Sequence, residues 1–139
     1  MIGTNDISGG RVPEHYRGRL EQVVRKCTAA GCVPILNTIP PRRGRDEAVA
    51  ETNKIIRDVA GRLQVPLADF HSECIRRRPD GSWDGTIISR DGVHPSGGKF
   101  NDYSEQNLNN CGYALRNWVN FLVYRQLYFH VLKPAGAQQ

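Results

Sequence analysis

The sequence has few of the residues that mark metal-binding, secreted or membrane-spanning proteins. Its 139 residues include four cysteines, which form no C-x-x-C pair and have no paired histidine spacing. A zinc site is therefore not expected, and most of the cysteines are predicted to be small core residues. The longest apolar stretch, "WVNFLVYRQLYFHVL", is interrupted by Asn120, Arg125 and Gln126, so no membrane span is expected. The opening "MIGTNDISGG" lacks the basic and apolar regions of a signal peptide.

Acidic side chains are outnumbered by basic ones, 14 against 19, which gives a formal net charge of +5. The arginines concentrate in "RRGR" (42–45) and "RRR" (76–78), without interleaved aromatic residues, so nucleic-acid binding is not expected. We interpret both runs as solvated loops. Because the first run follows Pro40 and Pro41 at the end of a predicted strand, attraction of an anionic substrate is a second interpretation.

Apolar periodicity predicts an alternation of helices and strands in one domain. Three helices are predicted, over 14–30, over 46–63 and from 110 or 111 to 131. Two buried strands are predicted, within 32–41 and over 65–70, and a polar loop leads from the second to Asp91. Gly31 is the expected end of the first helix, and Asp46 the expected cap of the second. This order is typical of a parallel sheet with helices on its faces.

The same periodicity predicts which side chains face the core. The expected inner positions are Tyr16, Leu20, Val23, Val24 and Cys27 in the first helix, Val49, Ile56, Val59 and Leu63 in the second, and Leu115, Trp118, Leu122 and Phe129 in the last.

The stretch "DGVHPSGG" sets an acid three residues before a histidine. A general-base histidine needs one ring nitrogen free for the nucleophile and the other held by an acceptor. Gly92 would let the chain turn so that the Asp91 carboxylate reaches the His94 ring, and Pro95 would stiffen the presentation of that ring. The motif predicts serine-type acyl transfer. The alternative is a plain turn with a solvated histidine.

A second motif, "GTND", follows the apolar residues "MI" at the start. Ligands of open parallel sheets sit beyond the carboxyl ends of the strands. If Met1 and Ile2 end a strand, Asn5 lies at that edge, and its amide can donate a hydrogen bond to a developing oxyanion. The alternative is that Asn5 and Asp6 only form a turn.

Together these motifs resemble the SGNH hydrolases, the GDSL-like lipase and esterase superfamily. "GTND" is similar to that family's third block and "DGVHP" to its fifth, while "GCVPILNTIPPRR" resembles the strand and loop between them. The resemblance implies an α/β fold, a three-layer α/β/α sandwich with a flavodoxin-like parallel sheet, here without its amino-terminal strands. It implies no metal or organic cofactor. The implied roles are general base for His94, its orienting acid for Asp91, oxyanion hole for Asn5, and substrate binding for Gly3, Thr4 and Pro40.

The family's nucleophile lies in a Gly-Asp-Ser block upstream of the G-x-N-D block, and the sequence contains no such block. Ser8, Ser82 and Ser96 are interpreted as ordinary loop hydroxyls. We therefore expect residues 1–139 to be a partial domain, with Met1 an internal residue or the gene truncated. The first predicted strand would then expose an unpaired edge, through which self-association is a further expectation.

The leading hypothesis is the carboxyl-terminal portion of a serine esterase or acyl hydrolase, inactive alone, whose intact form acts on a small-molecule ester or an acylated carbohydrate. The alternative is a non-catalytic ligand-binding module that lost its nucleophile. Binding without turnover would distinguish the two.

Overall fold

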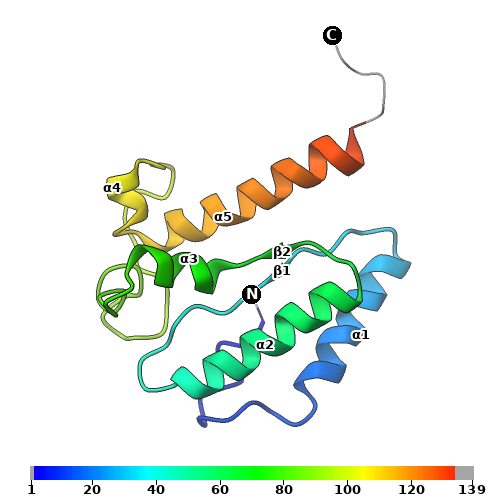
Figure 1. The fold of residues 1–139 in the computed structure, drawn as a ribbon, viewed down its shortest axis with the longest axis horizontal. Helices are drawn as coiled ribbons and strands as arrows, with labels where there is room; N and C mark the ends of the chain where they lie inside the picture. Colours follow the sequence, from blue (N-terminus) through cyan, green and yellow to red (C-terminus); the bar gives the residue numbers. More distant parts are fainter. Residues whose placement is uncertain (1, 134–139) are drawn as a thin grey trace.

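A short parallel sheet separates two layers of helices (Figure 1). The computed structural model describes residues 2–133. In chain order the elements are α1 (Tyr16–Ala29), β1 (Leu36–Asn37), α2 (Asp46–Arg62), β2 (Leu67–Ala68), α3 (Phe70–Arg77), α4 (Glu105–Leu108), α5 (Gly112–Leu127) and the π-helix η1 (Tyr128–Leu132).

Strands β1 and β2 run parallel, with Leu36 opposite Leu67 and Asn37 opposite Ala68. Helices α1 and α2 lie on one face of this pair and α5 lies on the other, while α3 follows directly from the carboxyl end of β2 (Figure 1). The predicted α/β sandwich with a parallel sheet is thereby confirmed. Within residues 2–133 no strand pairs with the second edge of β1.

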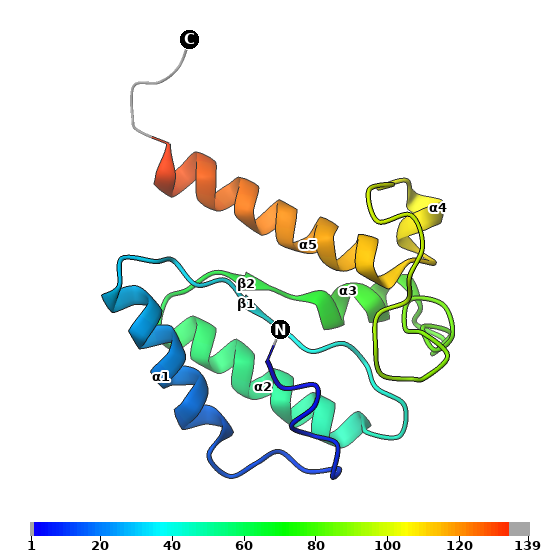
Figure 2. The same cartoon turned by 180° about the vertical axis from the view of Figure 1, so that it is seen from behind.

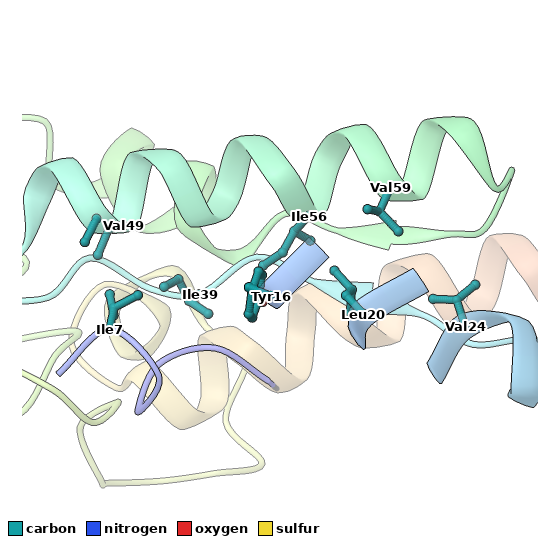
Figure 3. Packing of buried hydrophobic residues seen from close by; sticks show 9 residues of the cluster. Ile7, Tyr16, Leu20, Val24, Ile39, Val49, Ile56 and Val59 are labelled. Atoms are coloured by element: carbon teal, nitrogen blue, oxygen red, sulfur yellow. The ribbon is translucent and has the colours of Figure 1, made fainter. Parts of the chain in front are cut away.

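One core fills the space between α1, α2 and β1, and the amino-terminal segment contributes Ile7 to it (Figure 3). Ile7 is fully buried beside Ile39 and Val49, and so anchors the segment that carries "GTND". A second core lies under α3 and α5; its buried members are Phe70, Cys74, Ile87, Leu108, Cys111, Ala114 and Leu115.

Three of the predicted inner positions are wrong. Val23 is 43% exposed, Leu122 38% and Phe129 53%. Val23 lines a groove beside the unpaired edge of β1. Leu122 lies on α5 and Phe129 on η1, at the end of the chain where the last helix extends away from the sheet (Figure 2). Of the four cysteines only Cys74 and Cys111 are buried, so the core role predicted for most of them holds for two.

Helix α3 lies where a polar loop was predicted. Asp69 caps it by accepting a hydrogen bond from the Ser72 backbone N–H, at 3.1 Å. Phe70 and Cys74, four residues apart, turn the same face to the second core. At α2 the predicted cap is wrong: Arg45 holds the capping position without a side-chain bond, and Asp46 is the first helical residue.

The "RRR" run is also not a solvated loop. Arg76 and Arg77 belong to α3, and the Arg77 side chain is only 3% exposed. Its guanidinium bonds the carboxylates of Glu73 and Glu105, at 2.9 and 2.7 Å. Arg78 donates to the backbone oxygen of Asn109. The run therefore joins α3 to the short helix α4 and the residues that follow it.

Two buried polar side chains fix the backbone just after β1. The Asn53 amide, fully buried on α2, accepts from the Ile39 N–H at 2.8 Å and donates to the Ile39 carbonyl at 2.9 Å. The Thr38 hydroxyl donates to the Asp69 carboxylate at 3.0 Å and accepts from the His71 N–H at 2.9 Å. The carboxyl ends of the strands are thus held to α2 and α3 by side-chain bonds.

The Asp69 carboxylate is ionised at this strand end. Burial opposes its ionisation, but hydrogen bonds from Arg57, the Ser72 backbone and Thr38 outweigh that cost and lower the pKa of Asp69 to about 2.

Candidate active site

Asp91 and His94 meet in the loop between α3 and α4. The Nδ1 atom of His94 lies 2.7 Å from Oδ2 of Asp91. The His94 side chain is 63% exposed and the Asp91 side chain 50%. This is the contact that the motif predicted. Within residues 2–133, Nε2 of His94 makes no hydrogen bond to the protein. This nitrogen is therefore free to accept a proton from a bound group.

The three-residue spacing has a local physical cause. The second carboxylate oxygen of Asp91, Oδ1, accepts hydrogen bonds from the backbone N–H groups of Val93 and His94, at 2.8 and 3.0 Å. A carboxylate that caps the turn after it in this way places the third residue beside its other oxygen. Gly92 makes the turn with φ +71°, a conformation that other residues adopt at a cost.

The same carboxylate determines which ring nitrogen of His94 carries the proton. The Ser89 hydroxyl donates to Asp91 at 2.6 Å, and this bond, the His94 ring and the two backbone N–H groups hold the pKa of Asp91 well below its usual range. An ionised carboxylate accepts hydrogen bonds and donates none. The proton between the two side chains therefore belongs to Nδ1, and in the neutral ring Nε2 is left as the base.

Ser89→Ala should raise the pKa of Asp91 towards the ordinary value, because it removes the largest of the contributions that lower it. An aspartate in an unfolded chain has a pKa of about 3.9. Because the pKa of Asp91 is lower in the folded loop, ionisation of Asp91 stabilises the loop at pH values above the unfolded pKa. This stabilisation is lost as the pH falls through the pKa that Asp91 has in the folded loop. The variant loop should therefore lose its order at a higher pH. Carboxyl NMR titration of Asp91 measures the midpoint directly.

Ser82→Ala is the matched control for that titration. The Ser82 hydroxyl bonds the carboxylate of Asp80, at 2.7 Å, in a similar two-residue arrangement and lowers the pKa of Asp80. This variant should shift Asp80 and leave Asp91 unchanged. Equal Asp91 midpoints in Ser89→Ala and the parent protein would contradict the assigned cause.

The loop is fixed at its base by a short pairing of its two ends. The Ser89 N–H donates to the His94 carbonyl and the Ser96 N–H to the Ile87 carbonyl, both at 2.8 Å. Ile87 and Ile88 are fully buried. The Ser96 hydroxyl then accepts from the N–H of Gly112, the first residue of α5, at 2.9 Å. The segment that carries the histidine is therefore fastened to the second core and to the start of α5.

Asn5 lies in an exposed turn, and its carbonyl accepts from the Ser8 hydroxyl at 2.6 Å. Among residues 2–133 its side-chain amide has no hydrogen-bond partner, so the amide is available to a ligand. The oxyanion role stays a prediction.

The three residues predicted to bind substrate lie deeper. Gly3 and Pro40 are buried, and the Thr4 hydroxyl is buried without a hydrogen-bond partner among residues 2–133. Gly3 has φ +121°, and a Cβ atom there would lie 2.7 Å from the Tyr16 hydroxyl. Glycine is thus required for packing at this position. Substrate contacts by the three residues remain predictions.

All six serines of the chain lie in the described part, and each hydroxyl has a hydrogen-bond partner there. Ser8 bonds Asn5, Ser82 bonds Asp80, and Ser96 bonds the carbonyl of Asn110. None of the six hydroxyls bonds His94 within residues 2–133. The histidine and its acid are assembled, but the serine they would activate is not among these contacts.

The "RRGR" run lies in a loop, as predicted, and Arg43 is exposed, but its arginines also bond distant parts of the chain. Arg42 donates to the Thr4 carbonyl, and Arg45 donates to the Ser8 carbonyl at 3.0 Å. Arg43 forms a two-bond ion pair with Asp84. Each guanidinium is engaged by an internal acceptor, so the structure gives no support to the anionic-substrate interpretation. Sequence reasoning missed these contacts because the partners lie 37 to 41 residues away.

None of the helices in residues 2–133 is both long enough and apolar enough to cross a bilayer. In the same part of the chain, no three His, Cys, Asp or Glu side chains gather as metal ligands would.

Comparison with known proteins agrees with this geometry. The model of the GDSL-like Lipase/Acylhydrolase family matches residues 1–97. The fold is similar to that of a solved protein from Desulfitobacterium hafniense DCB-2, described as a lipolytic protein of the G-D-S-L family, with a TM-score of 0.65 at 19% sequence identity. That likeness covers 88% of this chain and 61% of the other, so this chain spans less than two thirds of the solved one. No curated protein matches the sequence. Because the family model covers more than half of the chain, including both "GTND" and "DGVHP", the chain belongs to the GDSL-like lipase/acylhydrolase family.

Proposed function

We propose that residues 1–139 form the carboxyl-terminal, acid/base part of an SGNH-type serine esterase domain that hydrolyses a small-molecule ester, with an acylated carbohydrate as one substrate class. The observation that carries the proposal is the 2.7 Å contact between Asp91 and His94, with Nε2 of the ring free of protein partners among the described residues. Family membership supports a lipase- or esterase-type hydrolase. The nucleophilic serine belongs, in this proposal, to a Gly-Asp-Ser block outside these residues.

Each group has a defined task in the proposed reaction. Nε2 of His94 takes the proton from the serine hydroxyl as its oxygen attacks the ester carbonyl, and later returns that proton to the leaving alcohol. Asp91 holds the ring by Nδ1 and stabilises the imidazolium that forms. The Asn5 amide donates to the oxyanion, where one such donor is worth about 10²–10³ in rate. Water then releases the acid from the acyl-enzyme by the same route.

The unpaired edge of β1 is part of this proposal. A groove of about 200 Å³ runs beside it, lined largely by apolar side chains, among them Ile2, Val23 and Ile35. Exposed strand edges recruit further strands. We propose that a strand of the intact domain covers this edge, and that a second copy covers it when the chain is alone.

The decisive experiment extends the protein upstream in frame and assays it beside the 139-residue chain on p-nitrophenyl acetate. Only the extended protein is expected to turn over substrate. His94→Ala in the extended protein should lower kcat about 10⁴-fold or more, because the base is lost. His15→Ala, which removes an exposed histidine at the start of α1, is the control and should change little.

Either of two results would overturn the proposal. One is an extended protein that folds but shows no turnover while binding ester ligands saturably, which would establish the non-catalytic binding module instead. The other is activity that survives His94→Ala, which would place the base elsewhere. Size-exclusion chromatography of the two proteins tests the edge contact, with a dimer expected for the short chain alone.

A further inference from the structure

The loop between β1 and α2 contacts both halves of the candidate site. We call residues 40–45 the arginine loop. Two of its arginines reach the segment that carries Asn5: Arg42 donates to the Thr4 carbonyl, and Arg45 to the Ser8 carbonyl. The third, Arg43, points to the other half of the site, the loop that carries Asp91 and His94. Figure 2 shows the arginine loop (cyan) running between these two parts of the chain.

Arg43 holds the backbone on both sides of Asp91. Its guanidinium donates to the Arg90 carbonyl at 3.1 Å, and its own backbone N–H donates to the Gly92 carbonyl at 2.9 Å. Nε and Nη2 of the same guanidinium bond the two oxygens of Asp84, at 2.6 and 2.7 Å. The carbonyls of the two residues that flank Asp91 are therefore both bonded by one residue of the arginine loop.

Gly92 lies too close to Arg43 for any residue that carries a side chain. A Cβ atom at Gly92 would lie 2.6 Å from Cβ of Arg43. Gly92 is buried although its neighbour Asp91 is exposed. The turn that brings Asp91 under the His94 ring is therefore packed directly against Arg43.

The bonds from Arg43 to Asp84 and to the Arg90 carbonyl require a guanidinium. Its planar fork can bond the two Asp84 oxygens and still donate to the Arg90 carbonyl, whereas a lysine ammonium is a point charge on a flexible stem. An exposed ion pair of this kind adds little to overall stability. The effect of the guanidinium is instead local, on the position of the Arg90 carbonyl.

We propose that Arg43 is a positioning residue of the Asp91–His94 pair, which acts through the Arg90 and Gly92 carbonyls to keep the Asp91 carboxylate on Nδ1 of His94. Its consequence for catalysis rests on the proposed function. The arrangement itself does not, so it can be tested on the chain as it exists.

The test observes the Nδ1 proton of His94 by proton–nitrogen NMR, which reports which ring nitrogen carries the proton and how fast it exchanges with water. In Arg43→Lys the exchange should become about tenfold faster or the signal should disappear, the change expected when a loop loses a charge-assisted hydrogen bond. Arg43→Gln should do the same. Asp84→Asn should have a smaller effect in the same direction, because it loosens the guanidinium but leaves its bond to the Arg90 carbonyl possible.

Arg76→Lys is the matched control. Arg76 is 64% exposed and also bonds a carboxylate through Nε and Nη2, that of Glu73, at 2.8 and 2.7 Å. It makes no contact with the Asp91 loop among the described residues, so the His94 signal should not change. Circular dichroism and a urea midpoint verify that every variant is folded.

The outcomes separate this proposal from the proposed function. If folded Arg43→Lys keeps the parent tautomer and exchange rate, Arg43 is not a positioning residue, whatever the activity of the extended protein. If the signal is lost in Arg43→Lys and the extended protein is inactive, the positioning holds and the esterase assignment fails. If Arg43→Lys in an active extended protein lowers kcat with an unchanged KM, both hold.

Discussion

Replacing Gly112 with alanine should destabilise the protein by about 3 kcal/mol or more, because the new methyl group has no room. A Cβ atom at this position would lie 2.0 Å from the Ile87 carbonyl oxygen and 2.8 Å from the Ser96 nitrogen. Both neighbours are backbone, so no side-chain rotation relieves the clash. The start of α5 must move away from the loop that carries His94. Urea unfolding followed by circular dichroism measures the loss.

Gly97→Ala is the control for this substitution. Gly97 is exposed in the same region, and a Cβ atom there would meet no atom within 4 Å. Its stability should change by no more than about 1 kcal/mol. Two variants of equal stability would show that α5 does not pack on the Ile87–Ser96 segment as described. Since Ser96 joins that segment to α5, Gly112→Ala should also disturb the His94 NMR signal in any fraction that folds.

Asn53→Ala is the second substitution with a large expected effect, a loss of about 3 kcal/mol. It removes both hydrogen bonds that the Asn53 amide makes to the Ile39 backbone and leaves a buried N–H and a buried carbonyl without partners. Unsatisfied buried groups are costly because they have also given up their water. The arginine loop begins at the next residue, so the disturbance should reach Arg43.

Asn117→Ala provides the comparison. Asn117 lies on the exposed side of α5 and forms no side-chain hydrogen bond within the described residues. Both substitutions place alanine in a helix, so the gain in helix propensity is shared, and the difference between them isolates the buried bonds. Asn117→Ala should change the free energy of unfolding by no more than about 0.5 kcal/mol. A similar small change in Asn53→Ala would contradict the role given to its amide.

The features that sequence reasoning predicted are those whose causes are local. The Asp91–His94 contact follows from a carboxylate that caps the turn after it, and all of its partners lie within three residues. The bounds of α1 and α2 followed from apolar periodicity for the same reason. Helix α3 carried a local signal as well, an acid followed three residues later by Ser72, with Phe70 and Cys74 on one face, but the preceding strand pattern concealed it.

What could not be predicted depends on contacts between distant residues. No residue near Arg43 in the sequence indicates that its partner is Asp84. The same holds for Arg77 and its partner Glu105. From the sequence alone, charged side chains at such positions are interpreted as solvated, because their partners come close only in the folded structure. The exposure of Leu122 and Phe129 is a similar case, because helical periodicity shows an apolar face and not what covers it.

The local origin of the Asp91 turn has a consequence for how such a site can change. Among residues 2–133, Ser89, Val93 and His94 supply every hydrogen bond to the Asp91 carboxylate, so the pair is built within six residues whose backbone Arg43 holds from outside. Its distance from Asn5, in contrast, is maintained by side chains that arise elsewhere in the chain. A change in the length of the arginine loop that keeps the Arg43 contacts would therefore alter the spacing between the two parts, so a related chain could hold the same acid and base at a different distance from the oxyanion.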